Sequence, residues 1–197
     1  MTLKAKWIDC LYTVATGSRR IRNLFTPLGA ICFGLFIFVF IFVSLKLDRL
    51  LGITDIFPRG FNVILSAPFF SVAVFLMGWS VHHFLKAKGT PVPFNPPPRL
   101  VTSGPYAYTR NPMLTGVFGL LFALGILLES VSLLFVFTPL FIYANYWELK
   151  AIEEPELVKR LGQAYVAYRK MTPMFLPSFI SLTFKEKDHE HRRTPKI

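Results

Sequence analysis

Apolar residues are concentrated in four long stretches that contain no Asp, Glu, Lys or Arg: residues 26–45, 61–81, 111–128 and 130–147. Each is close to the ~20 residues that cross a ~30 Å hydrocarbon core, and the last two are a little shorter. None alternates polar and apolar residues at helical spacing, so a water-facing side is missing. The pattern therefore predicts an all-α integral membrane protein with about four transmembrane helices. For the last two stretches, a buried helical hairpin is the alternative.

Two shorter segments show the periodicity of amphipathic helices. In the first, residues 2–16, the apolar side chains recur as Leu3, Trp7, Cys10, Leu11 and Val14. In the second, a C-terminal helix after the last span, they recur as Leu157, Leu161, Ala164, Tyr165 and Tyr168. Pro155 disfavours helical geometry at Glu154, which predicts that this second helix begins at Pro155. Gly162 in its middle predicts that another group approaches the backbone closely, because glycine otherwise weakens a helix.

Charge is segregated from the apolar stretches. The chain has 22 Lys and Arg against 11 Asp and Glu, a formal net charge of +11. Basic residues crowd the N-terminal segment and the connection after the second stretch, whereas the turn after the third offers only Glu129. The excess of Lys and Arg on cytoplasmic segments then predicts that both termini are cytoplasmic. The chain divides into an N-terminal segment (1–25), a two-span scaffold (26–81), a Pro-rich loop (82–110), a hairpin with the C-terminal helix (111–180) and a charged tail (181–197).

The Pro-rich loop begins at His82 and ends at Arg110. Its prolines exclude a packed helix and predict a rigid, extended segment. His82 and His83 are adjacent and so lie on different faces of a helix, which makes them a poor metal pair. We expect no metal site.

The third span begins at a well-specified helix start, Asn111-Pro112. Asn accepts hydrogen bonds from the free N–H groups of a first turn, and Pro at the next position loses none. Such a start beside Arg110 could hold an anion, or it could be a purely structural cap. Because the Glu129–Ser130 turn lies midway between Asn111 and Glu153, a hairpin of the last two spans returns Glu153 to the same membrane face. Arg110, Asn111 and Glu153 are therefore expected to share one pocket, although an Arg and a Glu there could equally form a structural ion pair.

Two motifs carry a family resemblance. The first is residues 100–113, which read LVTSGPYAYTRNPM. The second comprises residues 153–157, which read EEPEL, and residues 161–168, which read LGQAYVAY, and it is followed by Pro173 and Pro177. Together they resemble the isoprenylcysteine carboxyl methyltransferase and phospholipid methyltransferase superfamily, in particular its bacterial members. The likeness covers roughly the second half of the chain.

The resemblance implies S-adenosylmethionine as cofactor, with Glu153 at its charged amino-acid end. The remaining residues that it places at the cofactor are Leu100, Val101, Tyr106, Asn111, Pro112, Met113 and Leu114. The candidate catalytic residues are Arg110, Glu153 and Glu154, with Arg110 orienting an anionic group and the acids acting as base or cation partner. Three positions depart from the family pattern: Leu114 replaces a Tyr, Leu161 replaces a Phe, and Leu149 stands where the prenylcysteine enzymes place an Arg.

The resemblance predicts an S-adenosylmethionine-dependent methyltransferase that acts on a lipid or lipophilic small molecule. We expect a multi-pass protein of the bacterial inner membrane that binds no nucleic acid, and leave its oligomeric state open. Two alternatives remain: a membrane reductase of related architecture that uses NADPH, and a non-catalytic membrane subunit whose basic tail serves an anionic partner.

Overall fold

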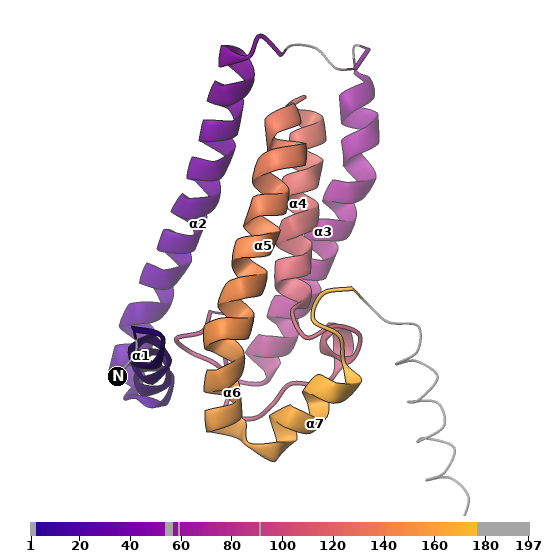
Figure 1. Ribbon diagram of the computed structural model, residues 1–197. Coiled ribbons are helices and arrows are strands. Elements are labelled where there is room, and N and C mark those ends of the chain that lie inside the picture. The colour runs from indigo at the N-terminus through magenta and orange to yellow at the C-terminus, as the bar shows by residue number, and fades with distance from the viewer. Residues whose placement is uncertain (1–2, 54–56, 59, 91, 177–197) are drawn as a thin grey trace, which may run out of the picture.

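The computed structural model describes residues 3–53, 57–58, 60–90 and 92–176, and its regular elements there are all helical. Long helices run along one axis, and short helices gather at one end, which we call the inner end (Figure 1). The prediction of an all-α fold is confirmed for the described residues. The elements are α1 (Leu3–Thr16), α2 (Arg19–Leu50), α3 (Phe61–Lys86), η1 (Gly104–Ala107), α4 (Pro112–Leu127), η2 (Leu133–Phe137), α5 (Thr138–Glu148), η3 (Leu149–Glu153), α6 (Glu154–Leu161) and α7 (Gln163–Met171).

Two helices, α2 and α3, are long and apolar enough to cross a membrane. Their surfaces are almost entirely exposed in the isolated chain, with only 6% and 11% of the most apolar windows buried. An exposed apolar helix surface is stable in hydrocarbon and costly in water, so this exposure favours a lipid surround. The third apolar helix, α4, has 16 residues, and the fourth predicted stretch is divided between η2 and α5.

Helices α3 and α4 pack most tightly against each other. Gly116 of α4 lies against Met77 and the carbonyl of Ala73, where an added Cβ would approach within 2.6 Å of the Met77 side chain. A small residue at such a crossing lets two backbones approach closely, as is common between helices in membranes.

The core is centred on Phe141 of α5, whose side chain is fully buried. Its ring lies 5.7 Å from those of Phe36 and Phe40 of α2, and 6.0 Å from that of Phe118 of α4. Aromatic pairs at these separations contribute beyond their buried area. Phe141 therefore ties the N-terminal scaffold to the hairpin.

The outer turn of the hairpin is held by Asp48 near the end of α2. Its carboxylate accepts hydrogen bonds from the Ser130 hydroxyl and, at 3.0 Å, from the Ser132 backbone N–H. Asp48 thus serves as an N-cap from another helix for the segment that begins at residue 131. Asp48 lies beyond the first apolar stretch, 26–45, but it is still helical because α2 extends to Leu50. Asp55 and Arg59, which follow α2 in the connection to α3, lie outside the described residues.

From residue 131 to residue 161 the chain is helical without a break, passing through two π-helical segments, η2 and η3. Each segment is followed, two residues after its end, by a proline: Pro139 and Pro155. A π turn widens the helix locally and can absorb the missing N–H and the ring of a following proline. The predicted helix start at Pro155 is therefore wrong, because the residue before it, Glu154, already has helical angles of φ −60° and ψ −42°.

The helix ends instead at Gly162, which separates α6 from α7. Its φ of +60° and ψ of −139° are open essentially to glycine alone, and no atom lies within 4 Å of the position its Cβ would take. The expected close approach at Gly162 is thus wrong, and the glycine is needed for its backbone angles. The bend also shifts the helical phase, so that Tyr165 and Tyr168 are buried as predicted whereas Ala164 is exposed.

Substitution Gly162→Ala is expected to destabilise the protein by roughly 1–3 kcal/mol, because alanine must adopt a conformation that only glycine tolerates. Gly34→Ala is the matched control, since Gly34 lies inside α2 with open space around it. It is expected to be neutral or slightly stabilising. The measurement is the melting temperature of each purified variant in detergent, and equal values for the two variants would contradict this account of the bend.

Candidate functional site

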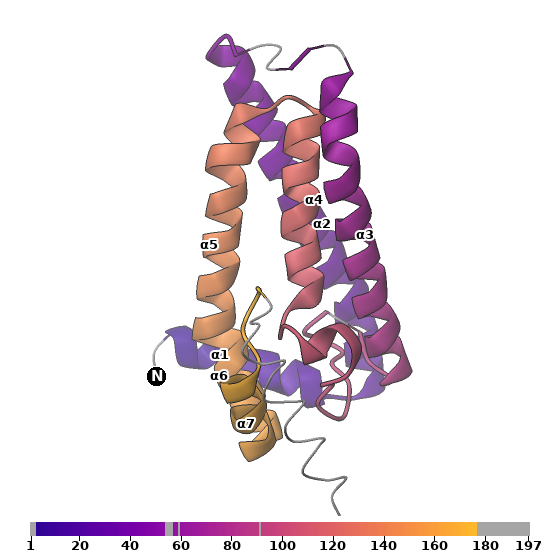
Figure 2. The ribbon, with the colours of Figure 1, turned by 90° about the vertical axis from the view of Figure 1, so that its right-hand side faces the viewer.

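The candidate site lies at the inner end of the helices. The chain reaches it three times: through the loop and η1 before α4, through η3 to α7, and through residues 172–176, which turn back toward α4 (Figure 2). The hairpin formed by α4 and the 131–161 helix returns Glu153 to the end where α4 begins, as the sequence predicted.

Arg110 and Glu154 form the central ion pair, 44 positions apart in the sequence. Both side chains are largely buried, with 11% and 9% of their surface exposed. The Arg110 guanidinium also donates to the Tyr165 hydroxyl at 3.3 Å, and Arg169 lies 3.3 Å from the second Glu154 oxygen. The Arg110 Nε is buried and has no hydrogen-bond partner in the described chain. The structural ion pair that the sequence left open therefore exists, with Glu154 rather than Glu153 as the acid.

Asn111 occupies the N-cap of α4 and Pro112 its first turn, as predicted, but the Asn111 side chain makes no capping hydrogen bond. Its amide nitrogen donates instead to the Met174 carbonyl at 3.3 Å. The backbone N–H groups of Arg110 and Asn111 donate to the carbonyls of Pro173 and Met174, at 2.9 and 3.2 Å. The predicted side-chain cap is therefore wrong, because the amide is used to hold the returning C-terminal segment.

This C-terminal segment is a part of the site that the sequence analysis did not place. Thr109 donates through its hydroxyl to the Met174 carbonyl at 2.8 Å, and Thr115 to the Phe175 carbonyl at 3.3 Å. The ring of Phe175 packs edge-on against Phe118 of α4, with centroids 5.1 Å apart. The only sequence signal for it was Pro173, which belongs to the family pattern.

Three buried tyrosines surround the ion pair. Tyr168 donates its hydroxyl hydrogen to the Tyr106 carbonyl at 2.7 Å, and the Tyr106 ring packs against Phe84 with centroids 4.8 Å apart. Burial raises the pKa of Tyr106 and of Tyr168, and raises the pKa of Tyr165 to about 12. These hydroxyls therefore stay protonated at neutral pH and do not act as bases; that of Tyr168 donates a hydrogen bond, and that of Tyr165 accepts one from Arg110.

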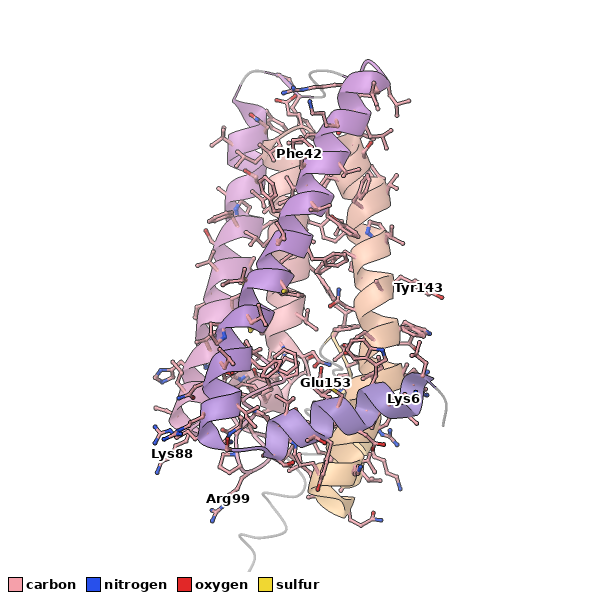
Figure 3. The ribbon with its side chains drawn as sticks, turned by 90° about the vertical axis from the view of Figure 1, so that its left-hand side faces the viewer. Lys6, Phe42, Lys88, Arg99, Tyr143 and Glu153 are labelled. Carbon is pink, nitrogen blue, oxygen red and sulfur yellow. The ribbon has the colours of Figure 1, made fainter. Side chains whose placement is uncertain are left out.

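No described residue donates a hydrogen bond to Glu153, which in this respect resembles Glu148 and differs from Glu154 and Glu156, both held by arginines. Figure 3 shows it at the inner end of the long helices, above the crossing helix α1. Burial, followed by the negative charges of Glu148 and Glu156, raises the pKa of Glu153 to about 8, while Arg160 opposes the shift. The negative charge of Glu153 also raises the pKa of the buried Tyr106, so the two side chains lie near each other. Near neutral pH Glu153 is thus largely protonated and able to lose its proton to favour a bound cation.

The remaining residues predicted to bind the cofactor lie along the same end. Pro112 is buried, whereas Leu100, Val101, Met113 and Leu114 are half-buried, and Leu114 packs against the core around Phe118. The structure brings Arg110, Asn111 and Glu153 to one end of the bundle. Their roles stay predictions.

Helix α1 covers one side of this end, packing against η3 and α6. Lys159 of α6 pairs with Asp9 at 2.8 Å and lies over the Tyr12 ring, 4.4 Å from its centroid. The amphipathic helix is present as predicted, but the prediction of which side chains form its apolar face is partly wrong. Leu3 and Trp7 are 75% and 59% exposed, and the side chains that turn toward the protein are those of Ile8, Leu11, Tyr12, Val14 and Ala15.

His82 and His83 belong to the last turns of α3, so the proposed loop begins later than residue 82. The His83 ring contacts Gly104, where an added Cβ would approach within 2.2 Å of Nε2. Gly104 has a φ of +60°, so both its conformation and this contact require glycine. Among the described residues, no three His, Cys, Asp or Glu side chains gather as metal ligands.

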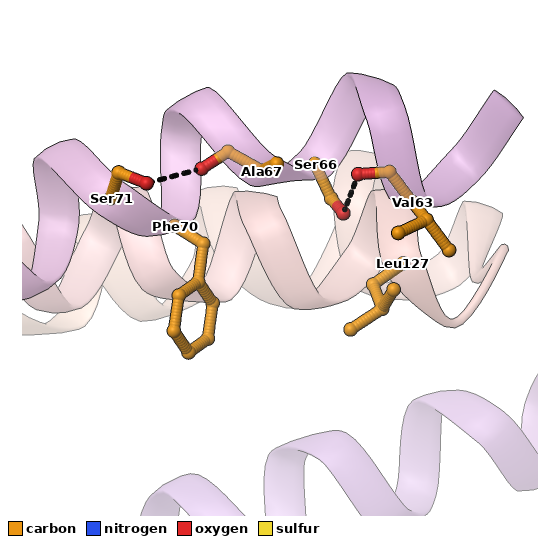
Figure 4. A pocket seen from close by; sticks show the side chains of 6 residues that line it. All are labelled: Val63, Ser66, Ala67, Phe70, Ser71 and Leu127. Carbon is orange, nitrogen blue, oxygen red and sulfur yellow. Dashed lines mark hydrogen bonds between the residues drawn. The ribbon is translucent and has the colours of Figure 1, made fainter.

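A shallow apolar depression lies at the opposite end of the bundle, between the start of α3 and the end of α4 (Figure 4). The Ser66 and Ser71 hydroxyls in its wall donate to carbonyls of their own helix. With no free polar group, this depression has no evident part in the chemistry. Its lining residues are Val63, Ser66, Ala67, Phe70, Ser71 and Leu127.

Glu153 is expected to make stability depend on pH. Its folded pKa of about 8 exceeds the unfolded value of ~4.3, so its protonated carboxyl favours the folded state. This contribution to the free energy of unfolding is complete below the unfolded pKa and is lost as the pH rises through 8. Glu153→Gln should therefore raise stability at pH 9 by roughly 1–3 kcal/mol relative to wild type and change it little at pH 5. Melting temperatures across this range test the expectation. Asp9→Asn, which removes a carboxylate at the surface of the same end, should keep the wild-type profile.

The comparisons with known proteins agree with this arrangement. The model of the family described as phospholipid methyltransferase matches residues 61–164, which extend from the first residue of α3 into α7 and include Arg110, Glu153 and Glu154. No curated protein and no solved structure matches the chain. The family match covers more than half of the sequence and points to a methyltransferase in a membrane. The chain belongs to the phospholipid methyltransferase family.

Proposed function

We propose that the protein is an S-adenosylmethionine-dependent methyltransferase whose acceptor is a lipid or a lipophilic small molecule. The observation that carries the proposal is the placement of Glu153. It is an acid near the buried Tyr106, without a hydrogen-bond donor among the described residues, inside the segment that matches the methyltransferase family. Glu153 is half-buried, an unpaired carboxylate that is partly removed from water is costly, and a cationic ligand would offset that cost.

The charged groups of the site suit the amino-acid end of this cofactor. Glu153 would hold its ammonium group. Arg110 would face its carboxylate through the unpaired Nε, while Glu154 and the Tyr165 hydroxyl keep the guanidinium in place. Glu154 is thus a positioning residue in this proposal, since both of its oxygens are already engaged by arginines.

The apolar part of the site suits an adenosine moiety. Leu100, Val101, Met113 and Leu114 offer half-buried apolar surface, and Tyr106 and Pro112 support them from the interior. Leu114 replaces a hydroxyl with a methyl-bearing side chain, so this position contributes packing and no hydrogen bond.

S-adenosylmethionine, when bound, would supply a methyl group from its sulfonium centre to the acceptor, and its sulfur would leave as a neutral thioether. The residues described above would align the two reactants and keep water away, which is the main source of rate in such a transfer. The Glu153 carboxyl would lose its proton when the cation binds. The buried tyrosines would remain neutral throughout.

We further infer four membrane spans with both termini in the cytoplasm of a bacterial cell. The uninterrupted helix from residue 131 supports the fourth span, because the 18 residues up to Glu148 extend ~27 Å, close to the ~30 Å of a hydrocarbon core. Helix α4 is shorter, at 16 residues, and begins next to the buried Arg110. The site then lies at the cytoplasmic boundary of the membrane, where a lipophilic acceptor can enter between helices.

S-adenosylmethionine is expected to raise the melting temperature of the purified protein in detergent, because it binds the folded state alone. Glu153→Gln should weaken its affinity about 10- to 100-fold, the loss typical of a hydrogen bond to a charged group, and Asp9→Asn should leave it unchanged. Since binding needs the carboxylate, wild-type affinity should also rise with pH between 6 and 8. Isothermal titration calorimetry measures both effects.

Stabilisation by NADPH in place of S-adenosylmethionine would favour the reductase, and binding of neither would favour a non-catalytic subunit. Equal affinity of wild type and Glu153→Gln would overturn the role of Glu153.

Membranes that contain the protein are expected to transfer label from methyl-labelled S-adenosylmethionine into a lipid extract. The Glu153→Gln variant, compared at equal protein level, should transfer at least about tenfold less, as follows from weakened binding. Label found in protein or in water-soluble compounds would contradict a lipophilic acceptor.

A further inference from the structure

The junction of α1 and α2, which we call the elbow, carries a dense positive charge. Arg19, Arg20 and Arg22 lie in the first turns of α2, whose first turn holds no acidic residue. No Asp or Glu of the described chain forms an ion pair with any of them. Cations at a helix N-terminus oppose the helix dipole, so this end of α2 is unfavourable unless an anion is present.

Arg22 is the residue that turns toward the protein. It lies on the same half-buried stripe of α2 as Thr26, Gly29 and Phe33, and Phe33 packs against the core residue Phe141. The Arg22 Nε is buried and has no hydrogen-bond partner in the described part of the chain. Its terminal nitrogens are not among the buried unpaired atoms and donate to no described residue, so they remain accessible. A guanidinium in this state can bind a phosphate through two parallel N–H groups.

The surface around Arg22 is strongly apolar. One turn along α2 from Arg22, Phe25 is 36% exposed, and on the outer side of the same turns Ile21, Leu24 and Leu28 are 44%, 68% and 52% exposed. Acyl chains pack against such a surface, whereas an inorganic ion gains nothing from it. The combination of basic and apolar side chains therefore suits a lipid better than a free anion.

The orientation of α1 places the elbow at the depth of the lipid head groups. Helix α1 crosses the inner end of the long helices, with Lys6 labelled near its N-terminal end in Figure 3. Its outer side exposes Leu3, Trp7 and two lysines. A helix with this pattern lies in the plane of a membrane interface, at the level of the head groups.

We propose that the elbow binds an anionic phospholipid of the inner leaflet, with Arg22 contacting the phosphate and Arg19 and Arg20 adding attraction from the surface. This lipid position is separate from the methyl-transfer site: it is built by residues 17–28, and the family match begins only at residue 61. It also does not depend on the proposed activity, because it needs only α2 to cross the membrane.

Native mass spectrometry of the detergent-solubilised protein tests the proposal, with phosphatidylglycerol and phosphatidylcholine as probes. The wild type should bind phosphatidylglycerol in preference to phosphatidylcholine, and Arg22→Gln should lower the phosphatidylglycerol affinity about fivefold, since each basic residue near an anionic surface contributes on that scale. Arg49→Gln, which removes an exposed arginine from the opposite end of α2, is the matched control and should bind as wild type does.

A second variant guards against misfolding of Arg22→Gln. Arg19 and Arg20 are exposed and oppose the helix dipole, so their double substitution by Gln should not lower the melting temperature and should still weaken phosphatidylglycerol binding. Wild-type affinity in both variants, or equal binding of the two lipids, would overturn the proposal. Stabilisation of the wild type by inorganic phosphate as large as that by phosphatidylglycerol would likewise overturn it, in favour of a free anion.

Discussion

The ion pair between Arg110 and Glu154 is the interaction on which the inner end of this protein depends. It joins the segment just before α4 to the first turn of α6, across the whole hairpin, and Arg169 and Tyr165 are attached to it. A buried pair of this kind contributes less to stability than to a single arrangement of the segments it joins, and loss of one partner leaves an uncompensated charge. With Glu154 already paired, Glu153 is left with no hydrogen-bond donor in the described chain.

The helices divide the molecule along its long axis. At the outer end, Asp48 holds the start of the last helix and the nearby depression is apolar, so little chemistry is available there. At the inner end, by contrast, arginines, acids and tyrosines are concentrated. The family match includes α3 and the hairpin but leaves out α1 and α2, which supply the charged elbow and three of the four rings that pack against Phe141.

Much of the fold follows from local patterns in the sequence. Apolar stretches near the length of a membrane span predicted α2 and α3, and the Asn111-Pro112 pair predicted the start of α4 to the residue. The positions at which helices end were harder to predict. Pro155 looked like a boundary, but the π turn before it lets the helix continue, while the φ of +60° at Gly162 ends it. Both outcomes depend on backbone hydrogen bonding over a full turn, which residue type alone does not specify.

The sequence by itself determined that the chain is helical, apolar enough for a membrane, and built with two motifs that a hairpin brings to one end. Hydrophobic spacing and helix length fix these features, because each acts within one segment. Only the tertiary structure decided that Arg110 pairs with Glu154, that the Asn111 amide holds Met174, and that Arg22 faces inward without an acid partner in the described chain. Those contacts join residues distant in sequence, and their choice depends on how side chains pack in space.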